Sequence, residues 1–324
     1  MKNLEIRSSI KKINEARPEI LVFGDTMLDH YVFGEVKRIS PEAPVPILNY
    51  KDEKSVLGGA GNVVHNLVNM GAKVHLSTIL GNDANGYEIL ALLKGIGIPD
   101  DKVFLSKNIN TTKKTRFLSG GSQLLRLDSD SRGLLEKDFN QIKKKLTQNS
   151  LMNLNAIIIS DYNKGVCSKE IIQLLTETAK IFDIPIFIDP KGPDWSKYYG
   201  ATCITPNIKE MEDHLNLKLI SDSDFKKGAK EIMRSLKIKS CLVTKGSDGM
   251  IFFDNENSIN QPVVEKEVFD VSGAGDTVIA CFSASLASNF TLIESLKLSS
   301  MVSSEVVTHT GTTPFNIEMV SSYE

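Results

Sequence analysis

The 324-residue sequence predicts an α/β fold with a mainly parallel central sheet flanked by helices. Short apolar blocks alternate with segments of helical periodicity along most of the chain. Strands that are apolar on both faces are typical of parallel sheets covered on each side. Neither an internal repeat nor a low-complexity linker interrupts this alternation. A single domain over residues 1–324 is therefore expected.

The expected strands are the apolar blocks Ile20–Gly24, Val74–Leu80, Ala156–Ser160, Ile184–Ile188, Ala201–Thr205, Ser240–Thr244 and Met250–Phe253. The expected helices between them include Asn62–Met70, Gly86–Lys94, Lys169–Phe182, Lys209–Leu215, Asp222–Leu236 and Asp276–Ala287. The first twenty residues mix charged and apolar side chains, which predicts a leading amphipathic helix and not a signal peptide.

Residues 30–57 and 112–128 depart from this rhythm, because apolar and polar side chains alternate in both. The second segment contains Ser119-Gly120-Gly121, a candidate hairpin turn. We interpret the two segments as a small β-sheet lid beside the main sheet. A few strands alone are marginally stable, so this lid is expected to cover a substrate, contact a second subunit, or both.

Composition excludes several classes of function. The net charge is −2 and 41% of residues are apolar, so nothing favours nucleic acid or an anionic membrane surface as a partner. No apolar run is long enough to span a membrane. The four widely spaced cysteines predict buried thiols in a reducing compartment. We expect a soluble, cytoplasmic protein.

The most informative motif is DVSGAGDT at 270–277, a glycine turn followed by an apolar helix. Backbone N–H groups of Gly273, Ala274 and Gly275, together with the helix start, predict an anion site. A carboxylate there would repel the anion, unless Asp276 accepts a proton from a hydroxyl while the turn stabilises a phosphoryl group in transfer. The alternative is that Asp276 merely caps the helix.

Two further clusters are candidate sugar-binding sites. Asp25 and Asp29 follow the first strand, where ligands bind in open α/β sheets, although both could be turn or cap residues. The run Gly58-Gly59-Ala60-Gly61-Asn62 would let the backbone approach a ligand, and Asn62 offers a donor and an acceptor. No Walker A motif occurs, which disfavours a P-loop kinase.

Two strand ends suggest a metal–nucleotide site. Asn207 and Glu210 lie three residues apart at a helix start and could order the water shell of Mg²⁺, although they could equally form a capping pair. Thr244-Lys245-Gly246 with Gly249 could border a nucleotide or form a plain turn. Four basic residues are candidates for a second phosphate: Arg38, Arg116, Arg126 and Lys191.

Taken together, these residues resemble the ribokinase-type (PfkB) carbohydrate kinase family. DVSGAGD at 270–276 is similar to its C-terminal signature, and GGAGN at 58–62 with Gly71 and Gly81 to its N-terminal one. Val64 and Cys281 stand where the family usually has smaller residues. The resemblance implies a ribokinase-like three-layer sandwich with a β-sheet lid.

Longer phrases resemble one subfamily, the D-glycero-β-D-manno-heptose 7-phosphate kinases. These are GDTMLDHYVFG (24–34), RISPEAPVPIL (38–48), LLRLD (124–128), SDYNKGV (160–166), IDPKG (188–192) and TPNIKE (205–210). The bifunctional relatives add a nucleotidyltransferase with an H-x-G-H motif, which this sequence lacks. We therefore expect the kinase part alone.

The resemblance implies that Mg²⁺-ATP phosphorylates the anomeric 1-hydroxyl of the heptose 7-phosphate, a step toward ADP-heptose and the lipopolysaccharide core. Asp276 would be the base. The sugar would lie against Asp29, Asn62, Gly58 and Gly59, and the metal near Asn207 and Glu210. The nucleotide would border Ser272 and the residues Thr244, Lys245, Gly246 and Gly249. A homodimer through the lid is implied. A kinase for another sugar, or a non-catalytic sensor, remains the alternative.

Overall fold

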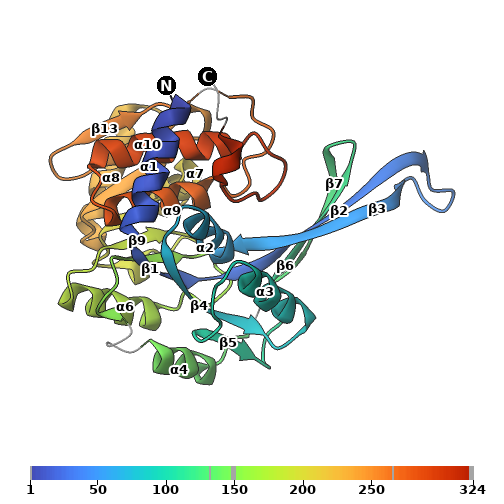
Figure 1. Cartoon of the computed structure of the whole chain (residues 1–324), viewed down its shortest axis with the longest axis horizontal. Helices are drawn as coiled ribbons and strands as arrows, with labels where there is room; N and C mark the ends of the chain where they lie inside the picture. Colours follow the sequence, from blue (N-terminus) through green and yellow to red (C-terminus); the bar gives the residue numbers. More distant parts are fainter. Residues whose placement is uncertain (1, 131–132, 147–150, 265, 321–324) are drawn as a thin grey trace.

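The computed structural model describes residues 2–130, 133–146, 151–264 and 266–320. Two sheets organise the chain (Figure 1). The main sheet has nine strands in the order β13-β12-β11-β10-β9-β8-β1-β4-β5, and the second has four in the order β3-β2-β6-β7. Neighbours from β11 to β5 pair in parallel, whereas β12 and β13 are antiparallel. The predicted α/β class, with a mainly parallel sheet and a separate small one, is confirmed.

The main-sheet strands are β1 (Glu19–Gly24), β4 (Lys73–Gly81), β5 (Val103–Ser106), β8 (Ala156–Ser160), β9 (Ile186–Asp189), β10 (Cys203–Ile204), β11 (Ser240–Thr244), β12 (Met250–Phe253) and β13 (Ser258–Gln261). The helices are α1 (Lys2–Ala16), α2 (Ala60–Asn69), α3 (Ala84–Gly95), α4 (Glu136–Lys145), α6 (Lys169–Ile181), α7 (Ile208–Leu215), α8 (Asp222–Leu236), α9 (Ala274–Ala287) and α10 (Leu292–Val306). Short 3₁₀ turns are η1 (Ser196–Tyr198), η2 (Gly246–Asp248) and η3 (Ile317–Met319).

Helices cover both faces of the main sheet, which makes three layers. Alternate residues of β1 show this: Ile20 and Val22 belong to a core with α1, α2, α3, α9 and α10. Leu21 and Phe23 belong to the opposite core with α4, α6, α7 and α8. Apolar side chains on both faces of a strand require this double cover. The four cysteines are buried and free, as predicted.

The second sheet, which we call the lid sheet, consists of β2 (Thr26–Ile39), β3 (Pro46–Gly59), β6 (Lys113–Ser119) and β7 (Ser122–Ser129). It extends away from the main body in Figure 1. The expected hairpin is present, and Gly120 and Gly121 have the positive φ angles that its turn requires. Strands β2 and β3 extend beyond the expected segment 30–57 at both ends. In particular, β2 begins only two residues after β1 ends. The lid sheet is therefore anchored at the carboxyl end of a central strand.

Among the described residues, no helix combines the length and the apolar character needed to cross a lipid bilayer.

Candidate active site

Asp276 lies in the first turn of α9, immediately after the glycine turn. Gly273 is the N-cap residue and adopts φ 81°, a left-handed conformation that favours glycine. The first N–H groups of a helix lack intrahelical acceptors, so this end of α9 presents donors and partial positive charge. The Ala274 N–H also contacts the Val271 carbonyl at 3.2 Å within the turn. A β-carbon at Gly275 would meet nothing within 4 Å, so the turn is open on that side.

Two side chains hold the Asp276 carboxylate. The Asn62 amide donates to Oδ2 at 2.8 Å, and the Tyr162 hydroxyl donates to Oδ1 at 2.7 Å. Burial raises the pKa of Asp276 to about 6, with Asp29 adding to the rise and the two hydrogen bonds opposing it. At neutral pH the group is therefore an ionised carboxylate that accepts a proton more readily than an ordinary aspartate.

Asn62 acts on Asp276, although the sequence suggested a role toward sugar hydroxyls. It is fully buried in the first turn of α2. Asn66 donates to its Oδ1 at 3.3 Å, which leaves the amide group facing Asp276. A β-carbon at Gly273 would lie 2.6 Å from the Asn62 Nδ2. The glycine turn therefore makes room for the amide that orients the carboxylate.

Asp29 and Arg116 form a buried ion pair between β2 and β6. Arg116 donates to Asp29 Oδ1 at 2.7 Å, and the Thr312 hydroxyl donates to Oδ2 at 2.9 Å. Gly58 lies against this carboxylate, because a β-carbon there would be 2.5 Å from Oδ2. Gly59, at φ 59°, lets β3 pass close to the Asp25 carbonyl. Two residues expected to contact the sugar and its phosphate separately are thus paired with each other.

The four predicted phosphate-binding residues are not brought together within one chain. Arg38 lies on β2 near the far end of the lid sheet, opposite Ile47 of β3. Arg116 of β6 lies opposite Tyr31 of β2, which is seven residues from Arg38 along the same strand. At about 3.3 Å per residue this is roughly 20 Å, too far to share one phosphate with Arg116. Arg126 is exposed, lies opposite Arg116 and binds Asp128.

Lys191, the fourth predicted phosphate ligand, lies at the main sheet, where its ammonium group donates to Glu210 Oε1 at 2.6 Å. The Asn207 side chain accepts from the Glu210 N–H, and Glu210 accepts from the Asn207 N–H, both at 2.9 Å. This is the capping pair that the sequence left open as the alternative. It fixes both side chains at the start of α7.

The Asn207–Glu210 pair still lies beside a concentration of negative charge. Burial, with Glu210 and Asp276 nearby, raises the pKa of Asp189 well above its usual value. Lys191, bound to Glu210, offsets part of this charge. The three carboxylates at the carboxyl ends of the strands still outnumber this one cation, and such a set suits a divalent metal ion. The residues therefore fit the Mg²⁺ that the sequence implies.

The segment after β11 forms a tight turn next to α7. Thr244 bridges to Asn207, and the Lys245 N–H donates to the Gly249 carbonyl at 2.7 Å. A β-carbon at Gly249 would lie 2.3 Å from the Gln261 carbonyl, whereas one at Gly246 would meet nothing within 4 Å. The plain turn that the sequence allowed as an alternative is therefore present, and its Gly246 side is open.

Ser272 is half-buried, and its N–H donates to Asp270 at 2.9 Å.

Sequence reasoning missed three functional candidates: Tyr162, Lys114 and Asp189. Tyr162 and Asp189 each lie at or just beyond the carboxyl end of a parallel strand, a placement that could have singled them out. Lys114 precedes Arg116 by two residues on β6, so both share a face, and its ammonium group lies 5.5 Å from the centre of the Tyr162 ring.

Asp25 positions Tyr162 through the backbone of the loop after β8. Its carboxylate accepts backbone N–H groups from Tyr162, Lys164 and Val166 at 2.8–3.0 Å. The turn reading of Asp25 is therefore the one that the structure favours. These hydrogen bonds connect the end of β1 to the loop after β8 and so hold the Tyr162 phenol against Asp276.

Residues 17–318 match the pfkB family of carbohydrate kinases. The chain belongs to this family. It is 38% identical over 315 residues to the bifunctional protein HldE of Sulfurimonas denitrificans, covering 97% of this chain and 66% of that protein. It is 37% identical over 303 residues to HldE of Helicobacter pylori, covering 94% and 65%. The chain thus spans slightly less than two thirds of these relatives.

Solved structures support the fold. Phosphofructokinase-2 from Escherichia coli in complex with substrates and products superposes with a TM-score of 0.76 at 23% identity, over 94% of this chain and 97% of that one. Arabidopsis thaliana ribokinase complexed with ribose and ATP gives 0.73 at 21%, over 94% and 97%. The ribokinase-like fold and the sugar-kinase class expected from the sequence are confirmed.

Proposed function

We propose that this carbohydrate kinase transfers the γ-phosphoryl group of ATP to the 1-hydroxyl of D-glycero-β-D-manno-heptose 7-phosphate. The product is the 1,7-bisphosphate, on the route to ADP-heptose and the lipopolysaccharide core. The observation that carries the proposal is the Asp276 carboxylate, held by Asn62 and Tyr162 beside an open helix start. The similarity to HldE proteins over most of the chain supports the heptose substrate.

The reaction uses Asp276 as the base. A carboxylate oxygen has two lone pairs, so Oδ1 can accept the sugar hydroxyl while it still accepts the Tyr162 hydroxyl. The hydroxyl oxygen attacks the γ-phosphorus, its proton passes to Asp276, and the bond to the leaving ADP oxygen breaks. Backbone N–H groups at Gly273 and Gly275 stabilise the phosphoryl charge in transit.

Mg²⁺-ATP would be held on the main-sheet side. Asn207 and Glu210 would order the metal, with Asp189 as a further carboxylate, and the metal would neutralise phosphate charge. The turn Thr244–Gly249 and Ser272 would border the nucleotide. On the lid side, Arg116 and Lys114 offer cations near Asp29, and Arg126 lies beside Arg116 for the sugar's own phosphate. Arg38 is too distant to join them within one chain.

The lid sheet is also the proposed homodimer contact. Four of its large apolar side chains are more than half exposed: Ile39, Tyr50, Leu125 and Leu127. Val45, in the connection between β2 and β3, is also about half exposed. Such apolar exposure is unfavourable for a surface that stays uncovered. We place the protein in the cytoplasm, where ATP is available. Light scattering of the wild type and of Leu125→Asp with Leu127→Asp tests the dimer. A monomeric wild type contradicts it.

The substrate is tested by ADP release in a coupled assay with heptose 7-phosphate, fructose 6-phosphate, ribose and a nucleoside. The proposal predicts the highest kcat/KM for the heptose 7-phosphate. A higher value for another sugar phosphate assigns a different kinase of the same fold. ATP binding without turnover on any of them indicates a sensor.

A further inference from the structure

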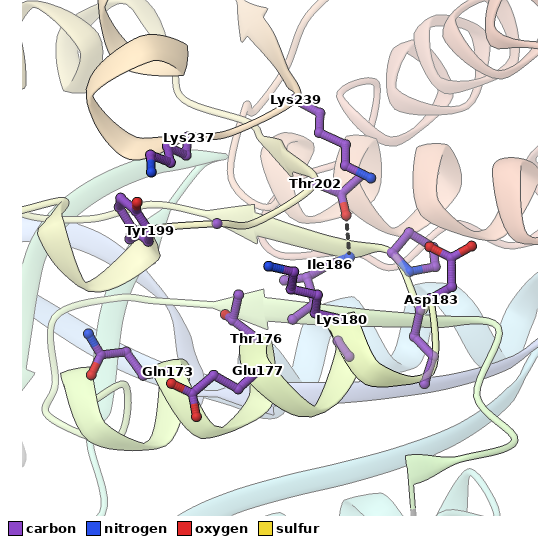
Figure 2. Close-up of a pocket in the computed structure, with 14 residues that line it drawn as sticks. Gln173, Thr176, Glu177, Lys180, Asp183, Ile186, Tyr199, Thr202, Lys237 and Lys239 are labelled. Carbon is purple, nitrogen blue, oxygen red and sulfur yellow. Dashed lines mark hydrogen bonds between the residues drawn. The ribbon is translucent and has the colours of Figure 1, made fainter.

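We propose that the amino-terminal edge of the main sheet binds a small organic phosphate that carries at least two phosphate groups. The site is a cavity of about 710 Å³ between the end of α6, the segment 199–202 and the segment after α8 (Figure 2). This volume lies in the range of small-molecule sites. The proposal goes beyond the kinase reaction and does not depend on its substrate.

The cavity and the catalytic groups lie at opposite ends of the same strands. Ile186 begins β9, Thr202 comes just before β10, and Lys239 comes just before β11. The candidate metal and nucleotide residues lie where these strands end, at Asp189 and Thr244. A ligand at the amino-terminal edge therefore does not compete with ATP or with the sugar.

Three lysines from two segments line the cavity. Lys180 comes from the last turn of α6, and Lys237 and Lys239 both precede β11. All three ammonium groups lie around one hollow in Figure 2. Among the described residues, neither Lys180 nor Lys239 forms an ion pair. Lys237 lies over the Tyr199 ring at 5.5 Å. Lys237 also interacts with the Tyr199 hydroxyl. Ammonium groups without an acidic partner around a concave surface are suited to phosphate oxygens.

The positive charge extends beyond the cavity. A neighbouring hollow of about 570 Å³ shares Lys237 and Lys239 and adds Lys230 and Arg234. The opposing charges are Glu177 and Asp183, which line the first cavity, and Glu231, which pairs with Arg234. Cations thus exceed acids here in a chain whose net charge is −2. This excess favours a ligand with several negative charges.

The test uses fructose 1,6-bisphosphate as the probe with the full chain in metal-free buffer. Calorimetry compares the wild type with the triple variant Lys180→Gln, Lys237→Gln and Lys239→Gln. Each lost charge contact at about 4 Å in water weakens binding about fivefold, so the triple variant should bind roughly 100-fold more weakly. The matched control changes exposed lysines elsewhere: Lys94→Gln, Lys107→Gln and Lys144→Gln.

Hydrogen exchange locates the probe. We expect protection of residues 173–186, 199–202 and 237–240 in the wild type, and no such protection in the triple variant. Lys180 and Lys237 also lie at helix C-termini, where a cation stabilises the helix. If that were their only role, the triple variant would have a lower melting temperature but would bind the probe as the wild type does. Equal binding by the triple variant and the wild type, or no binding by either, overturns the proposal.

Discussion

Replacing the Asp276 carboxylate, which we propose as the base, should make the folded protein more stable. Asp276 is 3% exposed, and burial raises its pKa from 3.8 to about 6. A carboxyl group whose pKa is higher in the folded than in the unfolded state stabilises the folded state most at a pH below its unfolded pKa. This contribution to the free energy of unfolding is lost as the pH rises through the folded-state pKa. Keeping Asp276 ionised therefore costs stability at neutral pH.

The magnitude follows from the shift of about 2 pKa units, each equivalent to about 1.36 kcal/mol, which gives about 3 kcal/mol at pH 7.5 and about 1.5 kcal/mol at pH 5. Asp276→Asn removes the charge and keeps both contacts. Its Oδ1 can accept from Asn62 while its amide donates to the Tyr162 hydroxyl.

Urea unfolding of wild type and variant at pH 5 and pH 7.5 measures the difference. We expect the variant to be more stable at both values and its advantage to grow by about 1.5 kcal/mol toward pH 7.5. An advantage that is equal at the two pH values, or a wild type that is more stable at pH 7.5, refutes the reasoning.

Three other changes test neighbouring parts of the site. Tyr162→Phe removes a hydrogen bond that lowers the pKa of Asp276, so the acid limb of the pH profile of kcat/KM should move to higher pH; an unmoved limb argues against the contact. Gly273→Ala should lower the free energy of unfolding by about 1–3 kcal/mol, because φ is 81° and the new β-carbon meets the amide of Asn62. The control Gly275→Ala should have the same urea midpoint of unfolding as the wild type, because its β-carbon meets nothing within 4 Å. Arg116→Ala leaves the buried Asp29 carboxylate without its cation, so the free energy of unfolding should fall by about 3–5 kcal/mol. The KM should rise far more for the sugar phosphate than for ATP. Equal rises in both KM values contradict a sugar-phosphate contact.

Much of the fold could be predicted because its central strands are apolar on both faces. All seven expected strands are present, with small changes in their bounds. The structure adds β5 (VFLS) and β13 (SINQ), which lie at the two edges of the main sheet. The polar, partly exposed SINQ of β13 resembles a loop in composition, whereas VFLS of β5 is apolar but only four residues long, too short to show a period.

The candidate site was predictable where chemistry follows local sequence. The glycine turn placed Asp276 at the head of a helix, and the structure has it there. The pairing of Asp29 with Arg116 joins residues 87 positions apart on separate strands, and no local pattern encodes it. Tyr162 escaped notice for a similar reason, because its role depends on the direction in which the loop after β8 turns.

The most direct test of whether this carboxylate takes the proton is the single-turnover rate of phosphoryl transfer by Asp276→Asn, measured together with its affinity for ATP. The account predicts a transfer rate to heptose 7-phosphate that is about 10²- to 10⁴-fold lower than that of the wild type, with an ATP Kd within about threefold. A variant that transfers the phosphoryl group at the wild-type rate would contradict it.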